Sequence, residues 1–266
     1  MIIRYIIGIF LLTLAIWGKV HYAKVEPYES VTLKASVSGL VLDVDLQAEG
    51  TMVKGVRVIH LDDRLDRINL EDTKHSVELL EQMLKINEEV ASSLEETVAR
   101  QKGYYERISK LSTTSKTQKD NAYSAYASAK TQYLGTKEKI VSLKKQIIDM
   151  QYRVAQLEDT IEKKSLVLLD KYLYKLMVRE GDFVAPGTPL ARVDDASRAK
   201  LVLFLEPEEL SDIQQKTVYL NDKKTDFKVN KVWRVADEKF ISSYRAEIYI
   251  SAPKDHFSEL LKVELK

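Results

Sequence analysis

Cysteine is absent from the 266 residues of this chain, which excludes disulfide bonds, thiolate metal sites and a lipid-modified N-terminal cysteine. Proline and glycine are scarce, with five and nine residues, and no proline lies between Pro27 and Pro186. Because proline disrupts helix interiors most strongly, this interval can accommodate very long helices. The 41 basic and 40 acidic residues almost balance, so a net charge of +1 provides no overall field that would favour nucleic acid.

One apolar run stands at the N-terminus. Residues 5–17 are uncharged and follow a single arginine, which is typical of an export signal or a membrane anchor. The run is shorter than the roughly 20 residues of a full span, but Trp17 and Tyr22 suit a membrane interface and Lys19 can extend its charge outward. No cleavage site is evident, so for residues 1–23 we favour a retained anchor over a cleaved signal, and both over a buried soluble helix.

A short motif occurs twice. Residues 49–63 read EGTMVKGVRVIHLDD, and residues 180–195 read EGDFVAPGTPLARVDD. Both copies begin with Glu-Gly, contain a second glycine and end with Asp-Asp, and alternating apolar residues before each copy predict β-strands. Because two short strands cannot bury a face alone, we expect the copies to pair into one small β-sandwich. It would consist of residues 24–63 and 164–196, with the intervening chain inserted.

The inserted segment, residues 64–163, has a helical pattern. Its second half has an apolar seam in steps of four and three: Ala122, Tyr126, Ala129, Tyr133, Thr136, Ile140, Leu143, Ile147, Met150, Val154, Leu157 and Ile161. Its first half is less regular and predicts a seam with a stutter: Leu79, Met83, Ile86, Val90, Leu94, Val98, Tyr105, Ile108 and Leu111. Polar residues 112–117 predict a reversal with Ser115 or a neighbour as N-cap. We therefore expect an antiparallel coiled-coil hairpin of about 70 Å.

The remaining residues, 197–266, alternate again. A strand is predicted over 200–205, a short helix from Pro207 through Gln215, and further strands over 218–220, 227–235, 244–250 and 261–265. This pattern favours a small β-barrel. The expected fold class is therefore α+β, with a long helical hairpin inserted into a split β-sandwich and followed by a barrel.

No catalytic, cofactor or metal site is predicted. The four histidines, His21, His60, His75 and His256, match no metal-ligand spacing, and the sequence has no P-loop, dinucleotide fingerprint or nucleophile elbow. Adjacent carboxylates, as in the two Asp-Asp pairs, point in different directions and do not suit shared acid-base chemistry. Asp62 or Asp63 is better explained as the N-cap of the helix that begins at Arg64. We expect a protein that is not an enzyme.

A split repeat around a long helical hairpin, behind an export segment and ahead of a β-rich tail, resembles the HlyD-like membrane-fusion family of bacterial periplasmic adaptor proteins. The resemblance covers essentially the whole chain, and the split repeat is its specific part. It implies a lipoyl-like (biotinyl-like) sandwich divided by the hairpin. It also implies a protein that links an inner-membrane transporter to a TolC-like outer-membrane channel for efflux or secretion.

The same resemblance implies location and assembly. The protein would be periplasmic, held to the inner membrane by its N-terminal segment, and would form a homo-oligomeric ring, often of six copies. Nothing follows the barrel for the membrane-proximal domain that many efflux adaptors possess, so we expect a minimal adaptor.

The resemblance also implies a docking site at the hairpin tip. Arg107, Leu111 and Ser115 match the Arg, Leu and Ser with which the family often enters the channel, and SKTQKDNA from Ser115 resembles the start of the family's second helix. The interval between Leu111 and Ser115 is shorter than the usual family pattern. Without the resemblance, Arg107 would be interpreted as a solvated charge and Leu111 as the last seam residue.

Two alternative functions stay open. One is a coiled-coil envelope tether without a transport role. The other is a biotin or lipoyl carrier domain, which is disfavoured because the modified lysine of a carrier occupies the turn that joins the two halves, where this chain has the hairpin.

Overall fold

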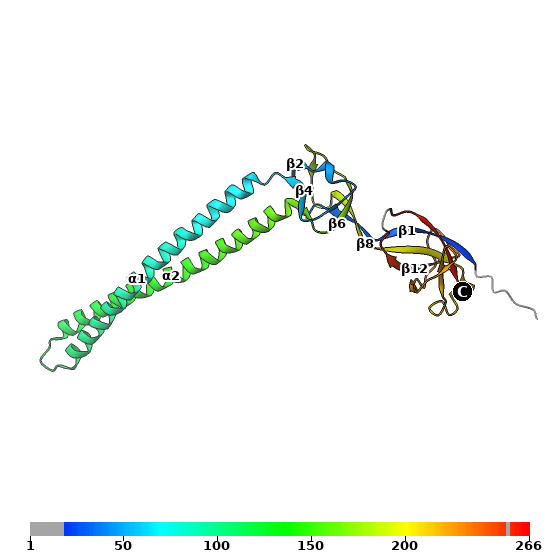
Figure 1. Cartoon of the computed structure of the whole chain (residues 1–266). Coiled ribbons are helices and arrows are strands. Elements are labelled where there is room, and N and C mark those ends of the chain that lie inside the picture. The colour runs from blue at the N-terminus through cyan, green and yellow to red at the C-terminus, as the bar shows by residue number, and fades with distance from the viewer. Residues whose placement is uncertain (1–18, 254–255) are drawn as a thin grey trace, which may run out of the picture.

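The computed structural model describes residues 19–253 and 256–266, and it consists of a long helical hairpin and two β-rich regions (Figure 1). We name the β region beside the hairpin the hairpin-side β region and the other the C-terminal β region. The apolar run 5–17 lies outside the described residues. Within the described residues, no helix combines the length and the apolar character needed to cross a membrane.

Two helices form the hairpin. Helix α1 (Arg64–Lys110) has 47 residues and α2 (Lys116–Lys163) has 48, which confirms the predicted pair of long helices. The side chain of Asp62 accepts the Arg64 N–H at 3.2 Å at the start of α1. Asp63 occupies the N-cap position without a side-chain capping bond and instead forms an ion pair with Arg67 at 2.7 Å. Of the two predicted caps, Asp62 is the one whose side chain acts.

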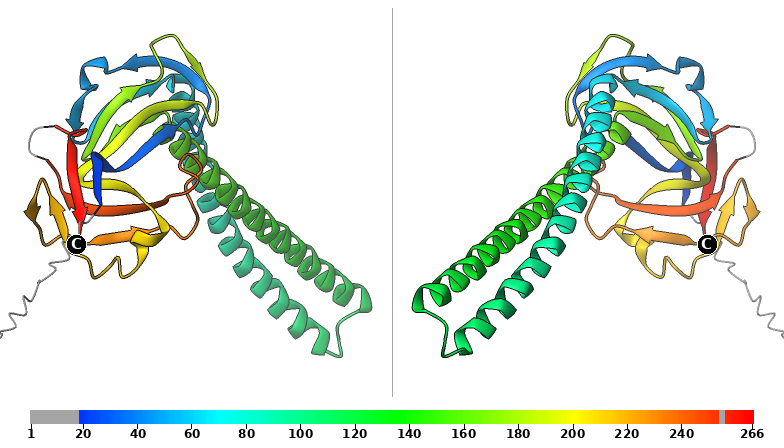
Figure 2. Two further views of the ribbon diagram at one scale, coloured as in Figure 1. Left: turned by 90° about the vertical axis from the view of Figure 1, so that its right-hand side faces the viewer. Right: turned by 90° about the vertical axis from the view of Figure 1, so that its left-hand side faces the viewer.

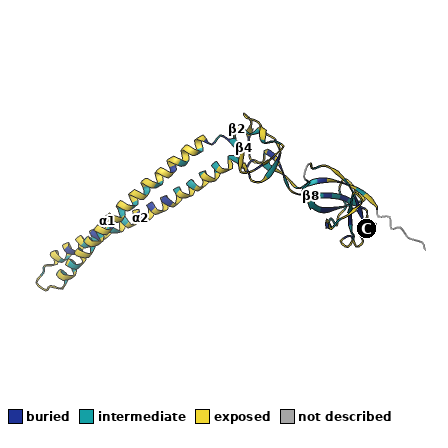
Figure 3. Ribbon diagram, in the orientation of Figure 1, coloured by how far each residue is buried: buried dark blue, intermediate teal, exposed yellow. Residues whose placement is uncertain are grey.

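The predicted seam of α2 is confirmed. All twelve of its residues are buried or half-buried, and Ala122, Ala129, Ile140, Leu143 and Ile147 are fully buried. The opposite faces of both helices are exposed, as the colouring by burial shows (Figure 3). The heptad spacing of this helix was therefore sufficient to identify the side that packs on α1.

The predicted seam of α1 is wrong in its first part. Leu79, Met83, Ile86 and Val90 are between 43% and 59% exposed. The buried and half-buried line instead follows an unbroken heptad: Thr73, Val77, Leu80, Leu84, Asn87, Ala91, Leu94, Val98, Gln101, Tyr105 and Ile108. Several members of this line are polar or small, so a search for apolar residues selected the exposed apolar residues beside it instead. The predicted stutter is absent, because the buried line keeps its heptad spacing throughout.

The hairpin-side β region is built from strands on both sides of the hairpin. A four-stranded sheet has the order β5 (Ser165–Leu168), β4 (Val56–Leu61), β2 (Gly39–Val44) and β7 (Phe183–Val184). Opposite it, β3 (Thr51–Val53) pairs with β6 (Lys171–Leu176), and β6 pairs with β8 (Pro189–Leu205). One apolar cluster, which includes Val41, Val53, Ile59, Leu173 and Val184, fills this region. The two motif copies thus contribute to one core.

The repeated glycines have a structural explanation. Gly50 and Gly181 have φ of +76° and +89°, in the left-handed region where a side chain is strained. Beside Gly50, the carboxylate of Glu49 accepts the N–H of Leu176 at 2.6 Å, so the first Glu-Gly pair connects to a strand that follows the hairpin. The motif marks tight turns at which the two halves meet.

A matched pair of glycine substitutions should separate backbone strain from loss of space. A Cβ added at Gly181 or at Gly135 in α2 would meet no atom within 4 Å, and only Gly181 has a positive φ. We expect Gly181→Ala to lower the free energy of unfolding by about 1 to 2 kcal/mol. Gly135→Ala should raise it by about 0.5 to 1 kcal/mol through helix propensity. Denaturant unfolding monitored by circular dichroism checks both, and equal effects of the two substitutions would contradict the strain explanation.

Two long strands connect the two β regions. Strands β1 (Val20–Lys34) and β8 pair along most of their length and continue into the C-terminal β region (Figures 1 and 2). There β8 pairs with β12 (Tyr244–Ser251), which pairs with β11 (Val229–Val232). The start of β1 pairs with β13 (Leu260–Leu265), followed by β9 (Val218–Leu220) and β10 (Lys223–Lys224).

The extent of β1 differs from the sequence-based boundaries. Residues 20–23, which we assigned to the N-terminal segment, are strand residues paired with β13. Ala23 and Val25 are buried in the C-terminal cluster together with Leu201, Leu203 and Ile248. The helix expected from Pro207 through Gln215 is limited to a short 3-10 helix, η2 (Pro207–Leu210).

The acid stability of the C-terminal β region should depend on Glu264. Hydrogen bonds from Lys262, at 2.8 Å, and from Lys266 lower the pKa of this carboxyl from 4.5 to about 2. Because the folded pKa is depressed, its contribution to stability is present above pH 4.5 and is lost as the pH falls towards 2. We expect Glu264→Gln to flatten the dependence of unfolding free energy on pH in this window. An unchanged pH profile would contradict the assignment.

Candidate functional site at the hairpin tip

The three residues predicted to dock lie around the reversal between the two helices. Arg107 is in the last turn of α1, Leu111 directly follows α1, and Ser115 directly precedes α2. All three are exposed, and Leu111 is 50% exposed even though the sequence seam included it. The structure thus places them at one end of the hairpin, where they are accessible from solvent.

The tip is held from beneath by packing between the helices. The ring of Tyr105 lies 5.4 Å from that of Tyr123 and stacks on Tyr126 at 6.4 Å with an interplanar angle of 3°. The ammonium group of Lys119 donates to the carbonyl of Ser109 at 3.0 Å and connects α2 to the end of α1. These contacts fix the ends of both helices while the predicted docking side chains remain outside them.

Ser115 has a structural role of its own. Its hydroxyl accepts the Gln118 N–H at 3.3 Å, and the Gln118 side-chain oxygen accepts the Ser115 N–H at 3.1 Å. This reciprocal capping box satisfies two N–H groups at the start of α2. The expected N-cap is therefore present, and any effect of changing Ser115 will include a folding component.

Arg107 has a different environment. A Cβ added at Gly103 would lie 3.5 Å from the Arg107 Nη1 atom, so the guanidinium extends back along the surface of its own helix. The apolar side chain of Leu111 and the charged side chain of Arg107 are thus both exposed, one turn apart. This combination can contact an apolar surface and a carboxylate of a partner at the same time.

The base of the hairpin has contacts that the sequence did not reveal. The Lys164 ammonium group donates to the Asp62 carbonyl at 2.6 Å and pairs with the Asp66 carboxylate. His60 and Ser165, which flank the two helices, are paired residues of β4 and β5. The strand that leads into α1 and the strand that follows α2 are therefore neighbours in one sheet, which holds the two helices together at the base of the hairpin.

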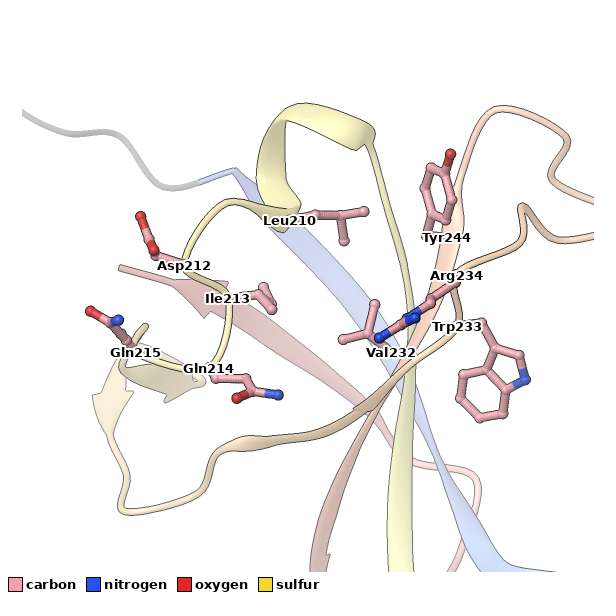
Figure 4. Close-up of a pocket in the computed structure, with 9 residues that line it drawn as sticks. All are labelled: Leu210, Asp212, Ile213, Gln214, Gln215, Val232, Trp233, Arg234 and Tyr244. Atoms are coloured by element: carbon pink, nitrogen blue, oxygen red, sulfur yellow. The ribbon is translucent and has the colours of Figure 1, made fainter.

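A hollow in the described residues lies elsewhere, in the C-terminal β region. It has a volume of about 680 Å³ and lies between η2, the residues after it and the end of β11 (Figure 4). Leu210, Ile213 and Val232 face its middle, whereas Asp212 and Gln215 point outward (Figure 4). Asp212 is the one acidic residue among the residues that line the hollow.

The carboxylates singled out in the sequence have separate partners. Asp194 accepts a hydrogen bond from Ser30 at 2.5 Å, and Asp195 accepts one from Ser197 at 2.6 Å. His21 contacts Glu209 at 2.7 Å. Burial alone would raise the pKa of Glu209, but the N–H of Glu206 and the side chain of His21 outweigh it, and the pKa is lowered. In the described part of the chain, no group of three or more His, Asp or Glu side chains is placed to hold a metal ion.

No known family model and no curated protein matches this sequence. Solved structures nevertheless match almost the whole chain. MacA from Actinobacillus actinomycetemcomitans is 15% identical with a TM-score of 0.74, covering 94% of this chain and 78% of that one. The membrane fusion protein Spr0693 from Streptococcus pneumoniae R6 is 10% identical with a TM-score of 0.57, covering 93% and 98%.

A third structure bears on the hairpin. A MacA-MexA chimeric protein that contains the Pseudomonas aeruginosa MexA alpha-hairpin domain is 16% identical with a TM-score of 0.53, covering 94% of this chain and 80% of that one. These likenesses show the fold: this chain has the fold of the membrane fusion proteins, also called periplasmic adaptors. The resemblance to the HlyD-like family, inferred from the split repeat, is thus confirmed for the fold.

Proposed function

We propose that this protein is a periplasmic adaptor that links an inner-membrane transporter to a TolC-like outer-membrane channel for efflux or secretion. The observation that carries the proposal is the hairpin itself. Its helices of 47 and 48 residues extend about 70 Å from a β region to an exposed tip. Its role is to span a distance and to position contacts, and it needs neither an enzymatic step nor a cofactor.

The β regions have matching roles in this proposal. The hairpin-side β region would be a lipoyl-like sandwich split by the hairpin, since β2, β3 and β4 pair with strands that follow it. The C-terminal β region would be a small β-barrel on the membrane side. The shared strands β1 and β8 connect the two and would keep the adaptor aligned between its partners.

The tip would dock into the outer-membrane channel through Arg107, Leu111 and Ser115. Exposure of Leu111 supports this part, because an apolar residue at the end of a coiled coil gains more from a partner than from water. Ser115 would contribute chiefly by fixing the start of α2.

A homo-oligomeric ring is supported by two uncovered apolar stripes. On α1 the stripe consists of Leu79, Met83, Ile86 and Val90, and on α2 of Leu134, Val141, Ile148 and Tyr152. The α2 residues are 54% to 67% exposed and follow heptad spacing in their first three members. A neighbouring copy that places α1 against α2 would bury both stripes. The number of copies depends on the angle between neighbours, and the resemblance implies a ring that is often of six copies.

Anchoring completes the proposal. The apolar residues 5–17 would hold the protein to the inner membrane and leave the described residues in the periplasm. The two alternatives, an envelope tether and a biotin or lipoyl carrier, lack a supporting observation of their own.

Gene deletion with complementation tests the proposal. We expect a deletion strain to lose export of a dye, a metal ion or a polypeptide, and the full chain to restore it. A chain in which residues 64–163 are replaced by a short turn should accumulate without restoring export. Export that persists in the deletion strain, together with weakened attachment between the envelope layers, would instead support the tether.

A further inference from the structure

The loop between β11 and β12, residues 233–243, carries two strongly exposed apolar side chains. Ile241 and Val235 are 84% and 77% exposed, the highest values among the large apolar side chains of the described residues. The sequence pattern placed Val235 at the end of a strand, but β11 ends at Val232. Single exposed apolar residues are ordinary, whereas two of this size on one loop point to a partner.

The loop has a defined shape that holds these side chains outward. The Asp237 N–H donates to the Ser243 carbonyl at 2.9 Å, and the Asp237 carboxylate accepts the N–H groups of Lys239 and Phe240 at 2.9 and 3.1 Å. The ring of Phe240 packs 4.3 Å from that of Phe204. The loop therefore does not fold Val235 and Ile241 back onto the β region.

Its position relates it to the N-terminus. Tyr244, just after the loop, pairs with Leu205 of β8. Glu206, which follows Leu205 in the chain, forms an ion pair with Lys19 at 2.5 Å. Figure 4 shows the start of β1, the helix η2 and the chain between Arg234 and Tyr244 at one end of the C-terminal β region. Lys19 is separated from the apolar run 5–17 by one residue, Gly18. A membrane that contains this run would thus face the end that carries the loop.

Two aromatic residues lie near this end of the C-terminal β region. Tyr22 is 71% exposed near the start of β1. The half-buried ring of Trp233 lies at the base of the loop, with the Lys231 ammonium 4.2 Å and the Arg245 guanidinium 5.0 Å from its centre. Amphipathic rings beside cations are typical of residues at a membrane–water boundary. Lipid headgroups therefore fit this surface.

We propose that residues 233–243 insert Val235 and Ile241 into the lipid interface of the membrane that holds the N-terminus, which fixes the C-terminal β region against the bilayer at a second point. The proposal rests on the anchoring proposed above. Arg234 and Lys239 are balanced by Asp237 and Glu238, so insertion is apolar and does not require anionic lipid. A lipid partner is favoured over a protein because the loop lies at the end of the C-terminal β region that carries Lys19, two residues after the apolar run in the sequence.

The absence of cysteine allows a direct test on the full chain. Ser242→Cys places one fluorophore in the loop, and Ser251→Cys places one at the far end of β12, roughly 25 Å away at the rise of an extended strand. Neither change replaces an apolar residue. The labelled proteins are reconstituted into phosphatidylcholine vesicles with or without bromine on the acyl chains. We expect bromine to quench the label at residue 242 several-fold more than the label at 251. Val235→Asp with Ile241→Asp should remove this difference while the protein still floats with the vesicles.

The outcomes separate this proposal from the anchoring. Equal quenching at both positions in protein that floats would overturn loop insertion and leave the anchor intact. Protein that does not float would overturn both. Quenching at residue 242 that requires phosphatidylglycerol would contradict apolar insertion. A photocrosslinker at position 241 that yields a protein adduct in cells, rather than lipid adducts, would show that the loop docks on a protein.

Discussion

Replacing Arg107 with alanine and Leu111 with aspartate should abolish export while the protein accumulates at its normal level. Both side chains are exposed, and Arg107 makes no ion pair in the described structure, so the double change should alter the free energy of unfolding by about 0.5 kcal/mol per site or less. The aspartate would place a charge where the proposed channel contact is apolar, which costs far more in the complex than in the free hairpin. Export assays and crosslinking to the channel measure the loss, and helical circular dichroism verifies the fold.

Ser115 provides the control for this experiment. Ser115→Ala removes the capping box and should destabilise the start of α2 by about 1 kcal/mol. Ser115→Asp retains a cap acceptor and should leave helix stability nearly unchanged. If the double variant at Arg107 and Leu111 exports normally at wild-type protein levels, these residues are only the solvated end of a coiled coil, and the shortened tip has a different partner.

Leu143→Asp should unfold much of the hairpin, whereas Val141→Asp, two residues away, should not. Leu143 is 3% exposed in the seam with α1, and Val141 is 67% exposed on the outer stripe of α2. The first change removes core packing and buries a carboxylate, with an expected cost of about 4 kcal/mol. The second should change stability by about 0.5 kcal/mol or less. Loss of helical signal and rapid proteolysis of the hairpin would be seen with Leu143→Asp alone.

The same pair tests the proposed ring. If neighbouring copies cover the outer stripes, Val141→Asp should yield folded protein with weaker self-association, measured by analytical ultracentrifugation of the detergent-solubilised chain. Folded Val141→Asp that associates like the wild type would show that this stripe is not an interface. Unfolding by Val141→Asp would contradict the burial pattern on which the seam is based.

The two halves of the hairpin show what heptad spacing can predict. On α2 the inward residues are mostly apolar, so spacing and hydrophobicity agreed and the seam was correct. On α1 the inward line includes Thr73, Asn87 and Gln101, while apolar residues such as Met83 face solvent. Hydrophobicity cannot choose between adjacent stripes when the outer one is the more apolar. The packing of α1 against α2 in the tertiary structure decides which of the two stripes is buried.

The sequence alone determined the long helices, their reversal and an N-cap of the second helix at Ser115 or a neighbour. All of these follow from local rules of helix propensity, capping and backbone conformation. The tip residues could likewise be located by spacing and resemblance, because they are defined by their distance from the reversal. The partner of these residues does not follow from such local rules, because it depends on the surface of another protein.

Only the tertiary structure decided the features that depend on non-local pairing. The sequence assigned residues 24–63 to one half-sandwich, but β1 pairs with β13 at its start and with β8 farther along, and so belongs to both β regions. Val235 was predicted in a strand, and only the folded C-terminal β region shows it exposed on a loop at the Lys19 end. Paired strands can lie at opposite ends of the sequence, as β1 and β13 do. A local sequence pattern therefore does not specify which edge of a sheet a strand will join.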